Sequence, residues 1–219
     1  MARVKGVGRW VKLGAGLGEG LRELILSCGE RAVGIDLAGS EANPSGWALL
    51  EAGHVRTALL GPDDEILEAT LSASPSLVAI DAPLSLPRAG YTRKVDREMH
   101  KLGLPVLPPM FPAMRKLTLR GIRLAGQLTA KGLEVIEVHP TSSRKVLGLP
   151  VRGRKAVQEA LMAIGLRGDL EAKPLSMHEL DAITAALTAI LHILGLSEVV
   201  GNEEGHICIP RRDLGLARS

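Results

Sequence analysis

Three short apolar runs along the chain share one design, because each is rich in apolar residues and ends at or near an acid. They are Arg31–Ser40 (RAVGIDLAGS), Leu77–Asp81 (LVAID) and Leu133–His139 (LEVIEVH). Apolar residues at every second position, as in the first run, are typical of a β-strand, whose side chains point alternately to its two faces. The pattern therefore predicts three strands that carry Asp36, Asp81 and Glu137 near their C-terminal ends. In open α/β sheets that edge is where ligands and metals collect, although a single such acid is also common as a solvated strand end.

The segment between the first two runs has the pattern of a hairpin followed by a helix. Gly46–Glu51 and His54–Leu60 flank Ala52-Gly53, a sequence typical of a tight turn between antiparallel strands. Proline and two acids after Gly61 then favour a helix that runs to about Ser72. A helical crossover makes the next strand, LVAID, parallel to the first. We therefore expect an antiparallel meander of three strands followed by parallel strands.

The clearest helical pattern in the chain begins at Ser176. Ser176 and Glu179 have the spacing of a capping box. The apolar stripe that follows consists of Leu180, Ile183, Leu187, Ile190 and Leu194. Asp181 lies beside this stripe, and burying its carboxylate without a partner would be costly. The sequence therefore predicts that this carboxylate points toward the sheet unless a partner or a metal ion holds it.

Other parts of the chain show weaker patterns. We expect a helix over Arg115–Lys131, one or two short helices after Thr141 and over Gly153–Ile164, and a small hairpin formed by Val199–Val200 and His206–Ile209. Residues 1–30 contain a glycine-rich run at 14–20 and then a helical stretch. We interpret residues 1–30 as an extension packed on a domain formed by residues 31–219. Phosphate binding by the glycine-rich run is the alternative, but the lysine of a P-loop is missing.

Composition narrows the class of protein. The 219 residues suffice for one substantial domain, and the 46% hydrophobic content supports a real core. Aromatic residues make up only 2%, so base stacking on an aromatic platform is nearly unavailable. Cys28 and Cys208 lack metal-ligand spacing and fit a reducing compartment as buried hydrophobes. No apolar run reaches the length of a membrane span, and we expect a cytoplasmic protein without membrane contact.

A proline-rich, basic insertion follows the second acidic strand end, at about residues 83–115. Six prolines interrupt it, and only Thr92–Lys101 has a helical pattern. Between residues 88 and 123 there are nine Lys or Arg and two acids, a net charge of +7 in a chain whose total is +3. We interpret this segment as a surface that meets phosphate, with Arg93, Arg97 and Arg120 as candidate substrate-binding residues. A solvated basic face is the alternative interpretation.

Six motifs together give the chain a family resemblance. They are GIDLAG at 34–39, AIDAPL at 79–84, VDRE at 95–98, LTLRGIRLA at 117–125, EVHPT at 137–141 and HELDAITAAL at 178–187. As a set they resemble domain-of-unknown-function family 429, whose members are labelled predicted RNase H-like nucleases. The resemblance covers Val33–Pro210 and leaves residues 1–30 outside. It agrees with the predicted order of strands and helices, which is that of the ribonuclease H fold.

The resemblance implies an α/β, ribonuclease H-like fold with a five-stranded mixed sheet, three antiparallel strands and then two parallel ones, flanked by helices. It also implies a metal site. Asp36, Asp81 and Asp181 match the acids of the first strand, the fourth strand and the final helix. Glu137 ends the fifth strand, where standard RNase H enzymes do not place their glutamate. Their usual position on the first helix is open to Glu65 or Glu68, so the fourth ligand stays undecided.

A cluster of carboxylates suits Mg²⁺ or Mn²⁺, which prefer oxygen ligands, and two such ions can promote hydrolysis of a phosphodiester. We therefore expect a divalent-metal-dependent nuclease with Asp36, Asp81, Glu137 and Asp181 as ligands and catalytic residues. His139 is a candidate proton shuttle, although a histidine before a proline often bonds only to backbone. His178, three residues before Asp181, is a further candidate ligand.

Two alternatives remain open at this point. The segment from Asp36 to Ser40 also resembles the phosphate loop of actin-like ATPases and sugar kinases, with Ser40 as a candidate substrate-binding residue. Those proteins clamp ATP between two such domains, so this chain would have to act as a homodimer. The second alternative is a nucleic-acid-binding module without catalysis. The sequence leaves open whether the substrate is DNA, RNA or a nucleotide.

Overall fold

The structure is a computed structural model that describes residues 2–3, 10–11 and 17–214. The helices are α1 (Leu17–Ser27), α2 (Asp63–Ala73), α3 (Lys94–Lys101), α4 (Arg115–Ala130), α5 (Pro140–Leu147), α6 (Arg154–Ala163), α7 (Asp169–Ala172) and α8 (Met177–Ile193), with a 3₁₀ turn at Arg212–Leu214. The strands are β1 (Ala2–Arg3), β2 (Trp10–Val11), β3 (Arg31–Asp36), β4 (Ser45–Glu51), β5 (His54–Leu60), β6 (Leu77–Asp81), β7 (Val135–Glu137), β8 (Arg167–Gly168), β9 (Ser197–Asn202) and β10 (Gly205–Pro210). Residues 14–16 of the glycine-rich run lie outside the described residues.

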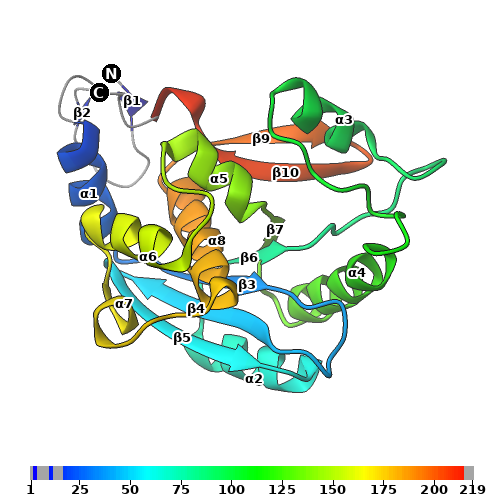
Figure 1. The fold of residues 1–219 in the computed structure, drawn as a ribbon, viewed down its shortest axis with the longest axis horizontal. Coiled ribbons are helices and arrows are strands. Elements are labelled where there is room, and N and C mark those ends of the chain that lie inside the picture. Colours follow the sequence, from blue (N-terminus) through cyan, green and yellow to red (C-terminus); the bar gives the residue numbers. More distant parts are fainter. Residues whose placement is uncertain (1, 4–9, 12–16, 215–219) are drawn as a thin grey trace.

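A six-stranded mixed sheet in the order β7-β6-β3-β4-β5-β8 forms the centre of the molecule (Figure 1). Strands β3, β4 and β5 form the predicted antiparallel meander. On the other side of β3, strand β6 runs parallel to it and β7 runs parallel to β6. A meander followed by parallel strands on the far side of its first strand is the ribonuclease H-like topology. The predicted fold class is therefore confirmed.

The strand count differs from the prediction. The sixth strand, β8, pairs in parallel with the outer strand β5 through only two residues, too few to produce a period-two pattern in the sequence. Strand β7 is also shorter than the apolar run at 133–139: it spans Val135–Glu137, and Val138 continues only as an isolated bridge to Cys208. Both strands are so short that their ends are set by tertiary contacts and cannot be read from the periodicity of the sequence.

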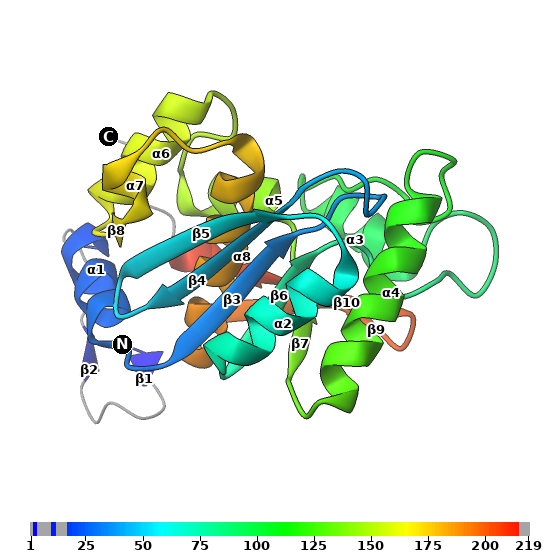
Figure 2. The same ribbon diagram turned by 90° about the horizontal axis from the view of Figure 1, so that it is seen from below.

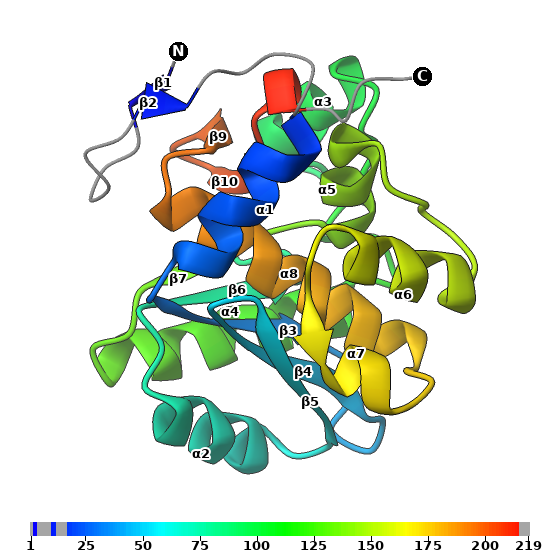
Figure 3. The ribbon, with the colours of Figure 1, turned by 90° about the vertical axis from the view of Figure 1, so that its left-hand side faces the viewer.

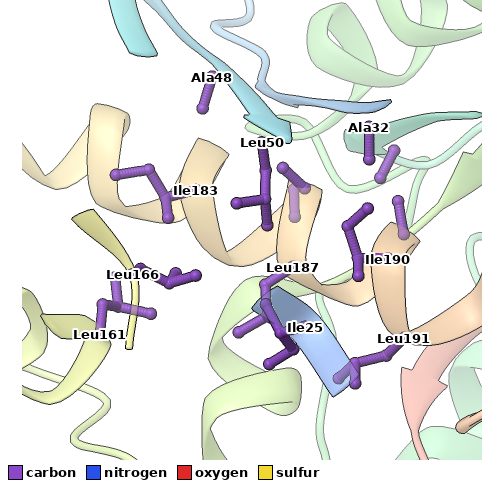
Figure 4. Close-up of a cluster of buried hydrophobic side chains, with 14 of the residues drawn as sticks. Ile25, Ala32, Ala48, Leu50, Leu161, Leu166, Ile183, Leu187, Ile190 and Leu191 are labelled. Carbon is purple, nitrogen blue, oxygen red and sulfur yellow. The ribbon is translucent and has the colours of Figure 1, made fainter. Parts of the chain in front are cut away.

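Helices cover both faces of the sheet. Helices α2 and α4 lie on one face (Figure 2), whereas α8 crosses the other face together with α1, α5 and α6 (Figure 3). The buried residues divide accordingly into a large cluster around α8 and a smaller one under α2 and α4. Within the large cluster, Ile183, Leu187 and Ile190 of α8 lie near Leu50 of the sheet and Ile25 of α1 (Figure 4). Cys28 and Cys208 are both free and buried, as expected.

Helix α8 packs directly on the backbone of β3 and β4 because two glycines leave room for it. A Cβ atom at Gly34 would lie 2.0 Å from the carbonyl oxygen of Ala182, and one at Gly46 would lie 2.0 Å from that of His178. Both distances are far below a permissible contact, so α8 approaches the sheet as closely as it does only because neither residue has a side chain. This close approach brings the first two turns of α8 to the ends of the central strands.

The proline-rich insertion contains one helix, α3, as predicted, and otherwise lacks regular structure. It lies beside α4 and the β9–β10 hairpin (Figure 1). Val95 and Met99 of α3 pack against Ile207 and Ile209 of β10 in a third apolar cluster. The insertion is therefore anchored to the domain by its own small core. Among the helices in the described part of the chain, none is long and apolar enough to span a bilayer.

Candidate metal centre

Asp36 and Asp81 lie side by side at the ends of neighbouring parallel strands. They are Cα partners in the register between β3 and β6, and such strands are about 4.8 Å apart. Both line a cavity of about 190 Å³, whose walls also include Pro83, Leu107 and His139. The predicted placement of these two acids on adjacent strands is confirmed.

The Asp81 carboxylate has no hydrogen-bond donor among the described residues. Burial raises its pKa well above the ordinary value, and the negative charges of Asp36 and Asp181 raise it further. A half-buried carboxylate without a donor, placed beside other acids, is stabilised either by a proton or by a cation. Of the acids in this cluster, Asp81 is therefore the one that a bound cation would stabilise most.

Asp36 is held by a histidine from the start of α8. The Nδ1 atom of His178 lies 2.6 Å from Oδ2 of Asp36, and the His178 side chain is 55% exposed. Burial raises the pKa of Asp36 to about 6, opposed by the hydrogen bond with His178 and reinforced by the charge of Asp181. His178 therefore belongs to the site, as its position one turn before Asp181 suggested.

Asp181 is paired with an arginine that the sequence analysis did not single out. Nη1 of Arg144, on α5, lies 2.5 Å from Oδ1 of Asp181 and also donates to Oγ1 of Thr184 at 3.0 Å. The Arg144 side chain is only 1% exposed. One signal in the sequence could have identified it: Arg144 lies at helical spacing between the apolar residues Pro140 and Leu147, on the same helix face. Of the two possibilities that the sequence left open for Asp181, a partner or a metal ion, the structure shows a partner, Arg144.

Glu137 forms a buried salt bridge. Its Oε2 and Oε1 atoms accept hydrogen bonds from Nη1 and Nη2 of Arg93 at 2.7 and 2.6 Å, and Oε2 also accepts from the Leu84 N–H at 2.8 Å. Arg93 is bound on its other side by Asp96. Burial lowers the pKa of Arg93, but the hydrogen bonds and charges of Glu137 and Asp96 outweigh it and raise the pKa above its ordinary value. Glu137 lines the same cavity as Asp36 and Asp81, but its charge is compensated by Arg93, so the structure gives it a salt-bridge role in place of the predicted role as a metal ligand.

Two of the three arginines predicted to bind substrate are interior residues. Arg93 is 1% exposed and Arg120 is 3% exposed. Arg120 donates to Asp63 and to the carbonyl oxygens of Ala38 and Gly61, each at 2.7 Å. The prediction that Arg93 and Arg120 contact substrate phosphate is therefore wrong, because their guanidinium groups hold the fold together. Only Arg97 is exposed, and one of its nitrogens donates to the Thr92 carbonyl.

The remaining candidates have less specific surroundings. Nδ1 of His139 lies 2.7 Å from Oγ of Ser142, and burial, with a smaller contribution from the charge of Arg144, lowers the pKa of His139 to about 4. Its imidazole is therefore neutral near pH 7. Ser40 lies exposed in the loop after β3 and accepts a hydrogen bond from the Ala42 N–H. The alternative ligands Glu65 and Glu68 are exposed on α2 and are not part of the cavity wall.

The donor set at the strand ends fits one hard divalent cation. Among the residues that the structure describes, no group of three or more His, Cys, Asp or Glu side chains is arranged to hold a metal ion. The cavity instead offers the paired carboxylates of Asp36 and Asp81, and no described residue donates a hydrogen bond to Asp81. Carboxylate oxygens that retain access to water are the ligands that Mg²⁺ and Mn²⁺ prefer.

Topology and paired acids together define a ribonuclease H-like α/β protein with an acidic site at its central strand ends. The chain belongs to the family described as protein of unknown function (DUF429), whose model matches residues 34–205. Among solved structures it is similar to RuvC from T. thermophilus in complex with Holliday junction substrate, with 17% identity and a TM-score of 0.44 over 76% of this chain and 96% of that chain. A second Thermus thermophilus RuvC structure matches with 17% identity and a TM-score of 0.41 over 75% and 96% of the two chains. No curated protein is significantly similar in sequence.

Proposed function

We propose that this protein hydrolyses phosphodiester bonds of nucleic acid in a reaction that depends on Mg²⁺ or Mn²⁺. The observation that carries the proposal is the pair of Asp36 and Asp81, aligned on adjacent strand ends beside a cavity, where no donor from the described part of the chain binds Asp81. The ribonuclease H-like strand order supports it, although the fold alone does not decide activity.

In this proposal Asp36 and Asp81 hold the cation, and the neighbouring residues orient them. When bound, a divalent ion lowers the pKa of a water molecule and neutralises charge on a phosphate oxygen. His178 orients the Asp36 carboxylate through its hydrogen bond, and Arg144 fixes Asp181, whose charge acts on both acids. His139 lines the same cavity as a neutral imidazole and is available to hydrogen-bond a polar group there.

The surroundings of the cavity support nucleic acid as the partner. A second hollow, of about 710 Å³, shares Val106, Leu107 and His139 with the first. Its wall also contains Arg97, His100 and Lys101, all exposed on α3 or at its end. A basic groove that leads away from an acidic, metal-competent cavity suits a polyanion, because the phosphates flanking the cleaved bond need cationic partners.

The test is cleavage of labelled single-stranded, duplex, hybrid and four-way-junction substrates in the presence of Mn²⁺. Wild type is compared with Asp36→Asn and with Asp64→Asn as a matched control, since Asp64 is an exposed acid on α2. We expect Asp36→Asn to lose activity by about two orders of magnitude or more, whereas Asp64→Asn keeps it. Equal rates in all three proteins would overturn the proposal. Binding without cleavage would favour a non-catalytic module, and binding of ATP in place of nucleic acid would favour the kinase-like alternative.

A further inference from the structure

A buried positive charge stands among the acids of the proposed metal site. Arg144 reaches from α5 to Asp181 on α8, and its side chain is 1% exposed, against 20% for Asp181. Its charge also acts on Asp36 and Asp81, where it opposes the rise in pKa that burial and the neighbouring acids cause. The guanidinium is therefore an integral member of the acidic cluster.

The contacts of Arg144 hold it in that position. Thr184 accepts a hydrogen bond from the same nitrogen that binds Asp181, and the Thr184 hydroxyl is itself fixed by donation to the Leu180 carbonyl. The Nε atom of Arg144 is buried and has no acceptor among the described residues, so Asp181 and Thr184 alone orient the group. Moving Arg144 away from Asp181 would leave a buried guanidinium without its charged partner, which is strongly unfavourable.

Arg144 compensates the charge of only one of the three aspartates in the cluster. Asp181 is neutralised by Arg144, and among the described residues neither Asp36, which is bound by the imidazole of His178, nor Asp81 has an arginine or lysine partner. One divalent cation compensates two carboxylates. A second cation at Asp181 would lie next to the guanidinium and be repelled by it.

We propose that Arg144 takes the place of a second metal ion, so that the site binds a single divalent cation through Asp36 and Asp81, with Asp181 as a positioning residue. This inference rests on the proposed function and adds the number of ions and the role of Arg144. It agrees with the lack, among the described residues, of any three-residue ligand set.

The stoichiometry of Mn²⁺ binding tests the proposal. Isothermal titration and electron paramagnetic resonance of the full chain with Mn²⁺ alone should give one ion per wild-type chain, with the spectrum of an isolated ion. Arg144→Met frees Asp181 and should raise the number to two, with the spectrum of a coupled pair. Arg152→Met is the matched control, since Arg152 is an exposed arginine, and should keep one ion. Asp181→Asn should also keep one ion, with affinity lowered by no more than about tenfold, as for a residue that acts on ligands from outside.

Two further variants keep the test decisive if Arg144→Met does not fold. Arg144→Lys keeps the charge and should keep one ion, and the double variant Arg144→Met/Asp181→Asn removes both partners and should also bind one. Two ions in wild type, falling to one in Asp181→Asn, would overturn this inference and leave the proposed function intact. Binding of no Mn²⁺ by wild type would overturn the proposed function and this inference with it.

Discussion

The guanidinium of Arg93, in the proline-rich insertion, donates hydrogen bonds to both carboxylate oxygens of Glu137, at 2.7 and 2.6 Å. The pair links the N-terminus of α3 to the end of β7, and Asp96 binds the same arginine from the other side. An acid at a strand end, which in the sequence has the pattern of a metal ligand, thus anchors the insertion to the sheet.

The first prediction follows from this pair. Arg93→Met should lower the free energy of unfolding by about 3–5 kcal/mol, because it leaves the buried Glu137 carboxylate uncompensated. Urea unfolding measures this change. Mn²⁺ affinity, measured by titration calorimetry on Glu137→Gln, should stay near that of wild type. A loss of Mn²⁺ binding in Glu137→Gln would show that this carboxylate is a ligand after all.

The second prediction concerns acid stability and Asp63. Burial raises the pKa of Asp63, but hydrogen bonds from Arg123 and Arg120 outweigh it, so the pKa lies below its ordinary value. A carboxyl whose pKa is lowered by folding stabilises the folded state above its unfolded-state pKa of about 3.9, and this stability is lost as the pH falls through the folded-state value. Asp63→Asn should therefore be less stable than wild type at pH 7, and the difference should shrink below about pH 4.

Urea midpoints measured between pH 7 and pH 3 test this dependence. Asp64→Asn provides the control, because it changes the adjacent, exposed acid of the same helix turn. A difference between Asp63→Asn and wild type that stays constant with pH would contradict the assignment.

The third prediction concerns the exposed cations of α3. Arg97→Ala and Lys101→Ala should each weaken nucleic-acid binding and reduce the slope of log affinity against log salt by about 0.9 per lost phosphate contact on duplex DNA. Lys155→Ala, which changes an 88% exposed lysine on α6, should leave both quantities unchanged. Fluorescence anisotropy at several salt concentrations gives the slopes. Equal slopes in wild type and the three variants would contradict the prediction and show that α3 is a solvated basic face.

The fourth prediction concerns the aromatic residues of the insertion. The low aromatic content suggested that base stacking is nearly unavailable, yet Tyr91 is 65% exposed and Phe111 is 52% exposed in the same segment. The backbone links their loops through a hydrogen bond from the Met110 N–H to the Tyr91 carbonyl. Replacing either ring by alanine should weaken binding of single-stranded DNA by about 1–3 kcal/mol for each base that stacks on it.

Duplex binding and stability should change little in these two variants, because the rings are exposed. Leu59→Ala removes a similarly exposed apolar side chain from β5 and serves as the control in the same anisotropy assay. Unchanged single-strand affinity in Tyr91→Ala and Phe111→Ala would contradict a stacking role.

The fifth prediction concerns the contact between α8 and the sheet. Gly34→Ala places a methyl group 2.0 Å from the Ala182 carbonyl, so α8 must move outward, at a cost of about 1–3 kcal/mol. The same movement separates His178 from Asp36 and should weaken Mn²⁺ binding. Gly29→Ala is the matched control, since a methyl group there meets nothing within 4 Å. Thermal unfolding and Mn²⁺ titration of both variants measure the two effects.

Local patterns in the sequence determined the backbone elements and the placement of two acids. The alternation in β3 and the turn at Ala52-Gly53 predicted the meander, and the crossover helix α2 predicted that β6 runs parallel to β3. Once β3 and β6 are adjacent and parallel, Asp36 and Asp81 must lie side by side. These features follow from residues close in sequence, because side-chain periodicity and turn chemistry act over a few residues.

Only the tertiary structure decided which arginine pairs with which carboxylate. Arg93 and Glu137 are 44 residues apart, Arg144 and Asp181 are 37 apart, and Arg120 and Asp63 are 57 apart. No local pattern relates such residues, since their pairing depends on how helices pack and on how strongly burial penalises an unpaired charge. For that reason the sequence marked Glu137 and Asp181 as equivalent candidate ligands, whereas the folded chain binds each of them to a different buried arginine.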